Sequence, residues 1–83
     1  MSLVEKRERS LAEAVAILVA AIHTSFPSVS THPSPPYEDE DFTLEVRIPA
    51  EMDRNEVMNT CIRHALEIED AYGFTILTPV KTA

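Results

Sequence analysis

The sequence predicts an α+β fold, a two-layer α/β sandwich in which two helices cover one face of a small sheet. Residues 42–48 alternate apolar and polar side chains, which is typical of a strand with one buried face. Residues 54–72 place apolar side chains at helical spacing, and residues 74–78 form a second β-rich run. A strand, a helix and a strand in this order predict a parallel β-α-β unit with a right-handed crossover. The expected element order is therefore α-β-α-β, in a single domain spanning residues 1–83.

The first helix is expected over residues 3–25 and ends before Phe26-Pro27, because a residue that precedes proline is disfavoured in a helix. Two capping-box patterns, one from Ser2 and one from Ser10, fit its start. The earlier start is favoured because it extends the apolar arc to Val4. That arc consists of Val4, Leu11, Ala14, Val15, Leu18, Ala21 and Ile22.

The first helix carries a second apolar face opposite this arc, made of Ala12, Ala16, Val19 and Ala20. Such small side chains allow another helix to approach closely. Alanine is also the best helix former, so the same pattern fits a face that simply contacts water. The small size of the predicted sheet favours a contact, and we expect an interface there.

Residues 27–41 are expected to form a mobile linker. They contain four prolines and end in an acidic run, a composition that opposes a helix or a central strand. Val29 leaves open a short edge strand over residues 28–31. The acidic run lacks the spacing of a calcium loop and is interpreted as a solvated charge run.

The strand over residues 42–48 is expected to turn its apolar side chains toward the helices and Thr43, Glu45 and Arg47 toward solvent. An aspartate in place of Thr43 should then be tolerated. Asp53 and Gly73 supply the start and stop signals of the second helix. The apolar arc of that helix consists of Val57, Met58, Cys61, Ile62, Ala65, Leu66, Ile68 and Tyr72.

Charge and composition exclude several classes of protein. The formal net charge is −7 and no basic stripe is visible, so nucleic acid is not an expected partner. The apolar run over residues 11–22 is too short to span a bilayer, so no membrane association is expected. A single cysteine leaves no internal disulfide, which favours a cytoplasmic location.

Cys61 and His64 are three residues apart on a helix, close enough to share a metal ion. A structural zinc site needs four ligands, and His23 and His32 would have to be recruited from distant segments. A buried cysteine beside a boundary histidine is the better interpretation, so no cofactor is expected.

Glu69 falls inside the apolar arc of the second helix. A carboxylate there can reach water at the frayed helix end, or pair with a cation such as Arg47 or Lys81. The alternative is an acid or base in a small pocket, acting with His64 or Arg47. No catalytic motif supports that alternative, and the only glycine, Gly73, cannot build a phosphate-binding loop.

Two strands are too few for a stable sheet, so we expect a homodimer that completes it. The first functional hypothesis is a non-enzymatic protein–protein interaction or accessory module. The second is a small enzyme, or an enzyme accessory domain, that uses a carboxylate and histidine pocket near Glu69. The third is a metal-binding protein that uses Cys61 and His64.

Overall fold

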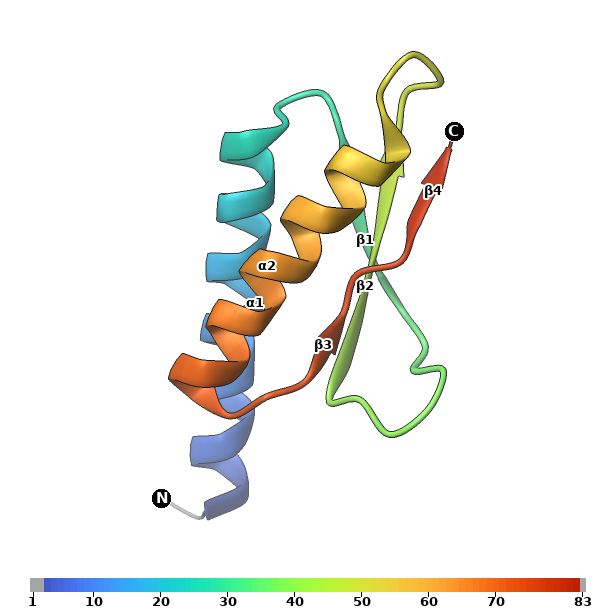
Figure 1. Ribbon diagram of the computed structural model, residues 1–83. Coiled ribbons are helices and arrows are strands. Elements are labelled where there is room, and N and C mark those ends of the chain that lie inside the picture. The colour runs from blue at the N-terminus through green and yellow to red at the C-terminus, as the bar shows by residue number, and fades with distance from the viewer. Residues whose placement is uncertain (1–2, 83) are drawn as a thin grey trace.

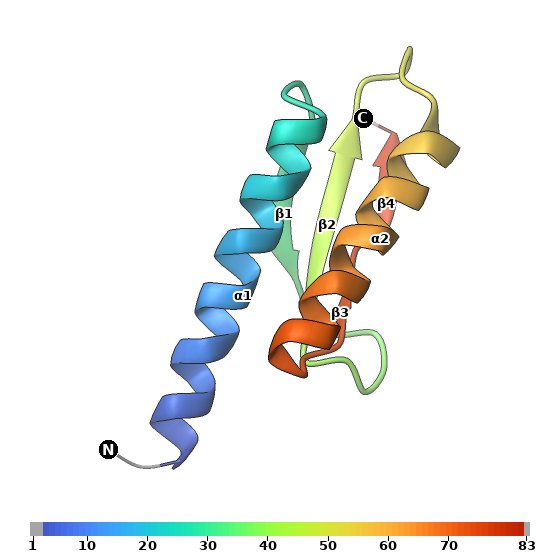
Figure 2. The same ribbon diagram turned by 60° about the vertical axis from the view of Figure 1, so that its left-hand side comes forward.

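The computed structural model describes residues 3–82, with side chains for residues 10–82. Two helices lie on one side of a mixed sheet (Figure 1), which places the chain in the α+β class that the sequence predicts. In Figure 2, α1 lies toward the β1 edge of the sheet and α2 lies over β3 and β4. The elements in chain order are α1 (Leu3–Ser25), β1 (Ser30–Ser34), β2 (Phe42–Ile48), α2 (Arg54–Tyr72), β3 (Ile76–Leu77) and β4 (Val80–Thr82).

The central strand of the sheet is β2. Its antiparallel neighbour is β1, with Thr31 opposite Val46, and its parallel neighbours are β3 and β4, with Val80 opposite the same Val46. The chain from β2 through α2 to β3 and β4 is the parallel β-α-β unit expected from the sequence. The predicted order α-β-α-β is incomplete, however, because the chain folds as α-β-β-α-β-β.

The additional strand β1 lies inside residues 27–41, where the sequence predicts a linker. Val46 donates its N–H to the Pro79 carbonyl (2.8 Å), so its neighbour Glu45 turns its backbone toward β1. Glu45 faces His32 in that strand, and the next residue, Pro33, therefore faces outward. A proline at an outer edge costs the sheet no hydrogen bond, which explains how a proline-rich segment forms a strand.

A proline also divides the last strand of the sheet. The parallel ladder requires residue 79 to donate an N–H toward Leu44, and Pro79 has none. Pairing therefore stops after Leu77 and resumes at Val80. The observed strand β3 is shorter than the strand predicted over residues 74–78. The segment after Pro79, which the sequence predicts to be a tail, contains β4.

The hydrophobic core fills the space between the helices and the sheet. From α1 it takes Ala14, Leu18 and Ile22, which are fully buried at successive turns of the helix. Burial of a side chain the size of Leu18 or Ile22 contributes about 1.5–3 kcal/mol. The side chain of Val4 and the capping box at Ser2 lie outside the part of the chain whose side chains are described. The other core residues are Val29, Leu44, Val46, Ile48, Val57, Cys61, Ile68, Phe74, Ile76 and Val80.

The ends of α2 follow the sequence signals. The Asp53 carboxylate accepts hydrogen bonds from the amides of Asn55 (2.9 Å) and Glu56 (3.3 Å). At the other end, Gly73 has a φ of 78° and donates its N–H to the Glu69 carbonyl (2.8 Å). Such a left-handed cap satisfies a carbonyl that the helix leaves without a partner.

The buried face of α2 is narrower than its apolar arc. Val57, Cys61 and Ile68 are buried, as the spacing predicts. Ile62 and Leu66 were expected on the same buried arc, but their side chains are 46% and 57% exposed. The sheet beneath α2 ends at β3 and β4, so it does not extend far enough to cover the outer part of the arc.

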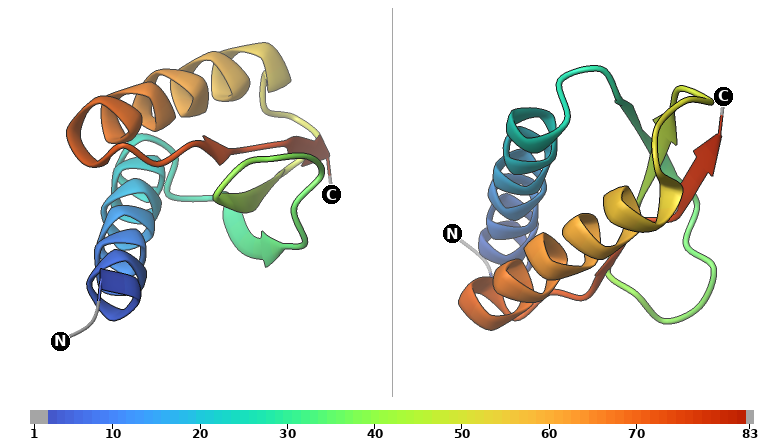
Figure 3. Two further views of the ribbon diagram at one scale, coloured as in Figure 1. Left: turned by 90° about the horizontal axis from the view of Figure 1, so that it is seen from below. Right: turned by 45° about the horizontal axis from the view of Figure 1, so that its top comes forward.

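The loop of residues 35–41 extends from the strands on the side opposite α2 in the right-hand view of Figure 3. Its acidic run is not simply solvated. The Glu40 carboxylate accepts hydrogen bonds from the amides of Tyr37 (2.7 Å) and Glu38 (2.8 Å) and from the Thr43 hydroxyl. Asp41 donates its N–H to the Thr75 carbonyl (2.8 Å), and the Asp41 carboxylate accepts the N–H of Thr75 (2.9 Å).

The outer face of β2 is therefore covered where the sequence predicts solvent. Thr43 is 1% exposed and Glu45 is 8% exposed, and only Arg47 of this set is open to water. The expectation that Thr43→Asp is tolerated is wrong in its premise. A carboxylate there would stand beside that of Glu40 without solvent between them.

Glu40 makes the loop sensitive to acid. The hydrogen bond from Thr43, helped by the amides of Tyr37 and Glu38, lowers the pKa of Glu40 from 4.5 to about 2. A depressed pKa stabilises the folded loop fully above pH 4.5, and this stabilisation is lost as the pH falls toward about 2. We expect faster amide exchange at Tyr37 and Glu38 over this window, measured by NMR.

Replacing Glu40 with glutamine should reproduce this loosening at neutral pH, because the amide group cannot accept all three hydrogen bonds in the same geometry. Endoproteinase Glu-C should then cut after Glu38 sooner than in the parent protein. Asp39→Asn is the control, since no hydrogen bond to that exposed side chain occurs among the described residues. Equal cutting rates in both variants would show that Glu40 does not hold the loop.

Candidate functional site

Most of the large exposed apolar side chains of the described residues gather in one place. Five large apolar side chains are exposed within the described residues, and four of them surround the outer side of α2, β3 and β4. These four are Tyr37, Ile62, Leu66 and Leu77, while the fifth, Ile17, lies on α1. Clustering of this kind is typical of surfaces that bind another molecule.

Two neighbouring cavities lie among these side chains. The larger, of about 370 Å³, lies between Met58 and Ile62 of α2 and Tyr37, Leu77 and Val80. The smaller, of about 160 Å³, is lined by Ile62, Leu66 and Leu77 and by Glu69 at its margin. The two share Ile62, Leu77 and Thr78 and so form one continuous depression. We call it the α2–β4 groove, defined by Tyr37, Met58, Ile62, Leu66, Leu77 and Val80.

The floor of the groove is the outer edge of β3 and β4, with which no other strand of the described residues pairs. Pro79 points its carbonyl toward β2, where it accepts the Val46 N–H. Residues two positions apart in a strand point their backbone groups to the same side, so Leu77 and Lys81 also face β2. The residues between them, Thr78 and Val80, therefore point their backbone groups away from the sheet. An edge of this kind can accept another strand. Arg54 hydrogen-bonds to this edge, donating from Nε to the Val80 carbonyl (3.1 Å).

The groove brings in one of the sequence-predicted residues, Glu69, at its end near β3. The other two proposed partners lie elsewhere. His64 shares a hydrogen bond with Ser25 of α1 (3.2 Å), on the side of α2 that contacts the other helix. Arg47 lies on the outer face of β2. Glu69, His64 and Arg47 therefore do not converge on one pocket.

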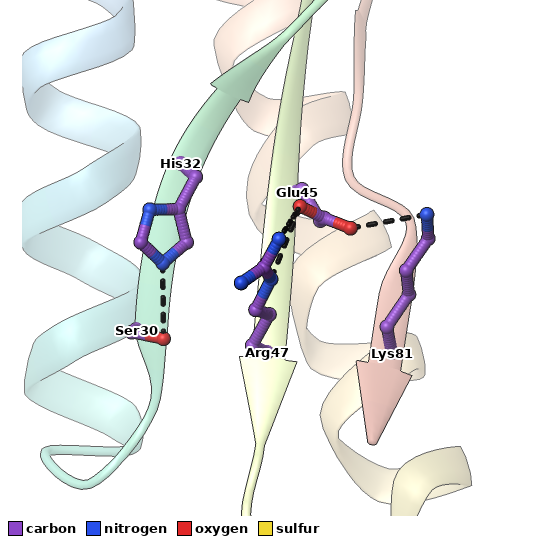
Figure 4. A network of polar contacts seen from close by, with 5 residues as sticks. All are labelled: Ser30, His32, Glu45, Arg47 and Lys81. Carbon is purple, nitrogen blue, oxygen red and sulfur yellow. Dashed lines mark hydrogen bonds and ion pairs between the residues drawn. The ribbon is translucent and has the colours of Figure 1, made fainter. Parts of the chain in front are cut away.

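Arg47 is held by Glu45 on the outer face of the sheet (Figure 4). Glu45 accepts from Arg47 (Nη2, 3.1 Å) and from Lys81 of β4 (Nζ, 3.1 Å). The Lys81 ammonium, and after it the Arg47 guanidinium, lower the pKa of Glu45, and Glu45 in turn raises the pKa of Lys81. Nearby on β1, His32 shares a hydrogen bond with Ser30 (3.3 Å). Both cations that the sequence offers to Glu69 are thus committed to Glu45.

Cys61 and His64 lie on the same helix but in different surroundings. Cys61 is fully buried in the core, and burial raises the pKa of its thiol to about 11, which disfavours the thiolate that binds metals. His64 points toward Ser25. Across the described residues, no group of three or more histidine, cysteine, aspartate or glutamate side chains is placed to hold a metal ion.

The predicted interface on α1 lies beside another cavity. Ala12 and Ala16 are exposed and line a space of about 420 Å³ together with Leu11, Val15 and Phe42. Of the other two residues predicted there, Ala20 is exposed, whereas Val19 is half-buried and packs against the core. The small side chains leave a hollow next to the aromatic ring of Phe42.

The sequence carries one signal of the groove. The apolar arc of α2 is wider than a single sheet face can bury, and Glu69 lies within it. The contributions of Tyr37, from the acidic loop, and Val80, from the expected tail, have no local signal.

No family model, curated protein or solved structure matches this chain. Neither helix, as far as residues 3–82 show, has an apolar stretch long enough to cross a membrane.

Proposed function

We propose that this protein is a non-catalytic protein–protein interaction module and that a partner docks as an extended segment in the α2–β4 groove. The observation that supports this is that four exposed apolar side chains lie beside a strand edge with which no described strand pairs. Strand addition uses both features, because the edge supplies main-chain hydrogen bonds and the adjoining pockets supply selectivity.

The lining of the groove favours docking over catalysis. Its centre is apolar, formed by Met58, Ile62 and Leu77. The acid proposed for catalysis, Glu69, is exposed, and its proposed partners His64 and Arg47 bind Ser25 and Glu45 instead. An acid–base mechanism needs groups that reach the same reacting atom. A partner side chain needs only an apolar pocket, which both cavities offer.

Ile62→Asp tests the proposal, because Ile62 lines both cavities and is exposed, so the change should leave the fold intact. A charge at the centre of an apolar contact costs about 2 kcal/mol or more, so partner affinity should fall about thirtyfold or more. Partners retained from cell extract by the parent protein should be identified, purified and titrated by calorimetry.

The matched control is Asn59→Asp, which places the same charge on an exposed position of α2 outside the groove. Bound partner should also slow amide exchange at Thr78 on the strand edge. A partner that binds the parent and Ile62→Asp equally, or that leaves Thr78 unprotected, would rule out the groove as its binding site.

A second proposal is self-association through α1. The sequence predicts a dimer on the premise of a sheet with only two strands, and that premise is wrong because β1 and β4 extend the sheet within the chain. The surface on α1 still favours a contact. Ala12 and Ala16 border the cavity of about 420 Å³, and Ile17 beside them is 47% exposed. We propose that a second copy of the chain packs its α1 against this surface.

Ala16→Arg should convert such a dimer into a monomer, because the long charged side chain would fill the cavity beside Phe42. The melting temperature of the parent, but not of the variant, should rise with protein concentration. Light scattering coupled to size exclusion measures the mass of each. Thr24→Arg, an exposed change in the last turn of α1, is the control. A parent protein of monomer mass at high concentration would contradict the proposal.

A further inference from the structure

The α2–β4 groove carries opposite charges at its two ends. Arg54 and Lys81 line the cavity at the β4 end, and Glu69 lines the cavity at the β3 end. Lys81 is ion-paired with Glu45 (3.1 Å), which also binds Arg47. Arg54 makes no ion pair with any carboxylate of the described residues, and Glu69 makes none with a cation there. Within the described residues, Arg54 and Glu69 are therefore charged groups of the groove without an ion pair, one at each end of its apolar centre.

At the N-terminal end of α2, Arg54 is the main group that can bind an anionic ligand, because the helix amides there are capped. The first amides of the helix, those of Asn55 and Glu56, are already occupied by the Asp53 carboxylate. Arg54 uses Nε to bind the Val80 carbonyl, which fixes the guanidinium beside the strand edge and leaves its terminal nitrogens for an acceptor. A guanidinium held in this way favours a carboxylate.

The spacing of the two charges sets the length of the ligand. Arg54 and Glu69 are the first and sixteenth residues of one helix, so their backbones are about 22 Å apart at about 1.5 Å per residue. An extended chain advances about 3.3 Å per residue, so about seven residues cover this distance. Side chains on one face of such a segment are two residues apart, and those facing α2 enter the cavities.

On the basis of the proposed function, we propose that the groove binds an extended peptide segment of about seven residues with a defined charge order. An acidic residue lies at the β4 end, next to Arg54, and a basic residue lies at the β3 end, next to Glu69. Alternate residues between them are apolar and contact Ile62 and Leu66. Charges at the rim of an interface set register and direction more than affinity, so this order determines which way the segment lies.

Selection from a phage-displayed library of random decapeptides tests the charge order. The parent protein is the bait, and Ile62→Asp is the bait for subtraction. Enriched peptides should show alternate apolar residues flanked by an acid and a base about six or seven positions apart. Selected peptides are then synthesised in pairs, one as found and one with its two charged residues exchanged, and titrated by fluorescence anisotropy.

The exchanged peptide should bind the parent about three to ten times more weakly, and the difference should shrink at high salt. With Glu69→Lys, the basic end of the peptide should become unfavourable, and Arg54→Gln should remove the preference for the acidic end while keeping a donor for the Val80 carbonyl. Equal binding of both peptides would overturn the charge order and leave the groove proposal standing. Failure to enrich any peptide that Ile62→Asp does not also bind would overturn both.

Discussion

Val46→Asp is expected to leave the protein unfolded at room temperature. Val46 is fully buried and central, with Thr31 on one side and Val80 on the other. The change removes about 1.5–3 kcal/mol of apolar burial and adds a desolvation cost of several kcal/mol for the carboxylate. A small domain has about 5–15 kcal/mol in total, so the sum is comparable to the whole stability. Circular dichroism and dispersion of the NMR spectrum measure the outcome.

Ser30→Asp is the matched control for this variant. It introduces the same side chain on the outer face of the sheet, where the exposed Ser30 lies opposite Arg47. Opposite charges across a strand pair are favourable by about 0.2–1 kcal/mol, so this variant should melt like the parent. If Val46→Asp kept the native spectrum, the position of the core between the helices and β2 would be wrong.

Gly73→Val is expected to lower the melting temperature by about 8–16 °C. Gly73 closes α2 with a φ of 78°, a conformation that a β-branched residue adopts only at a cost of about 2 kcal/mol. A Cβ at this position would meet no atom within 4 Å, so the cost comes from the backbone alone and not from a clash. For a domain of this size, each kcal/mol shifts the melting temperature by about 4–8 °C.

Gly73→Asn separates backbone strain from loss of flexibility, since asparagine tolerates the left-handed conformation. Its melting temperature should lie between those of the parent and Gly73→Val, as measured by calorimetry. Equal melting temperatures for the two variants would mean that the turn into β3 rearranges and that the observed φ does not constrain it.

The candidate site was only partly foreseeable. Glu69 stands out in the sequence because an acid interrupts an apolar arc, and the structure places it at the margin of a cavity. The local pattern could not show that the cations proposed for Glu69, Arg47 and Lys81, form ion pairs with Glu45 on the outer face of the sheet instead. Tyr37 joins the groove only because the Glu40 carboxylate folds the acidic loop back on itself.

The sequence by itself determined the central unit of this protein. Alternation over residues 42–48 placed Leu44 and Val46 on the buried face, and Asp53 and Gly73 marked the ends of α2. These signals are local, because side-chain periodicity and helix caps act within a few residues of one another. They are therefore visible before any tertiary contact is known.

The tertiary structure alone decided the edges of the sheet and the surface they create. β1 forms in a proline-rich segment because β2 supplies its hydrogen bonds and Pro33 happens to face outward. Ile62 and Leu66 are exposed because the sheet stops at β3 and β4. Each outcome depends on a partner far away in the chain, and local propensity carries no information about where that partner lies.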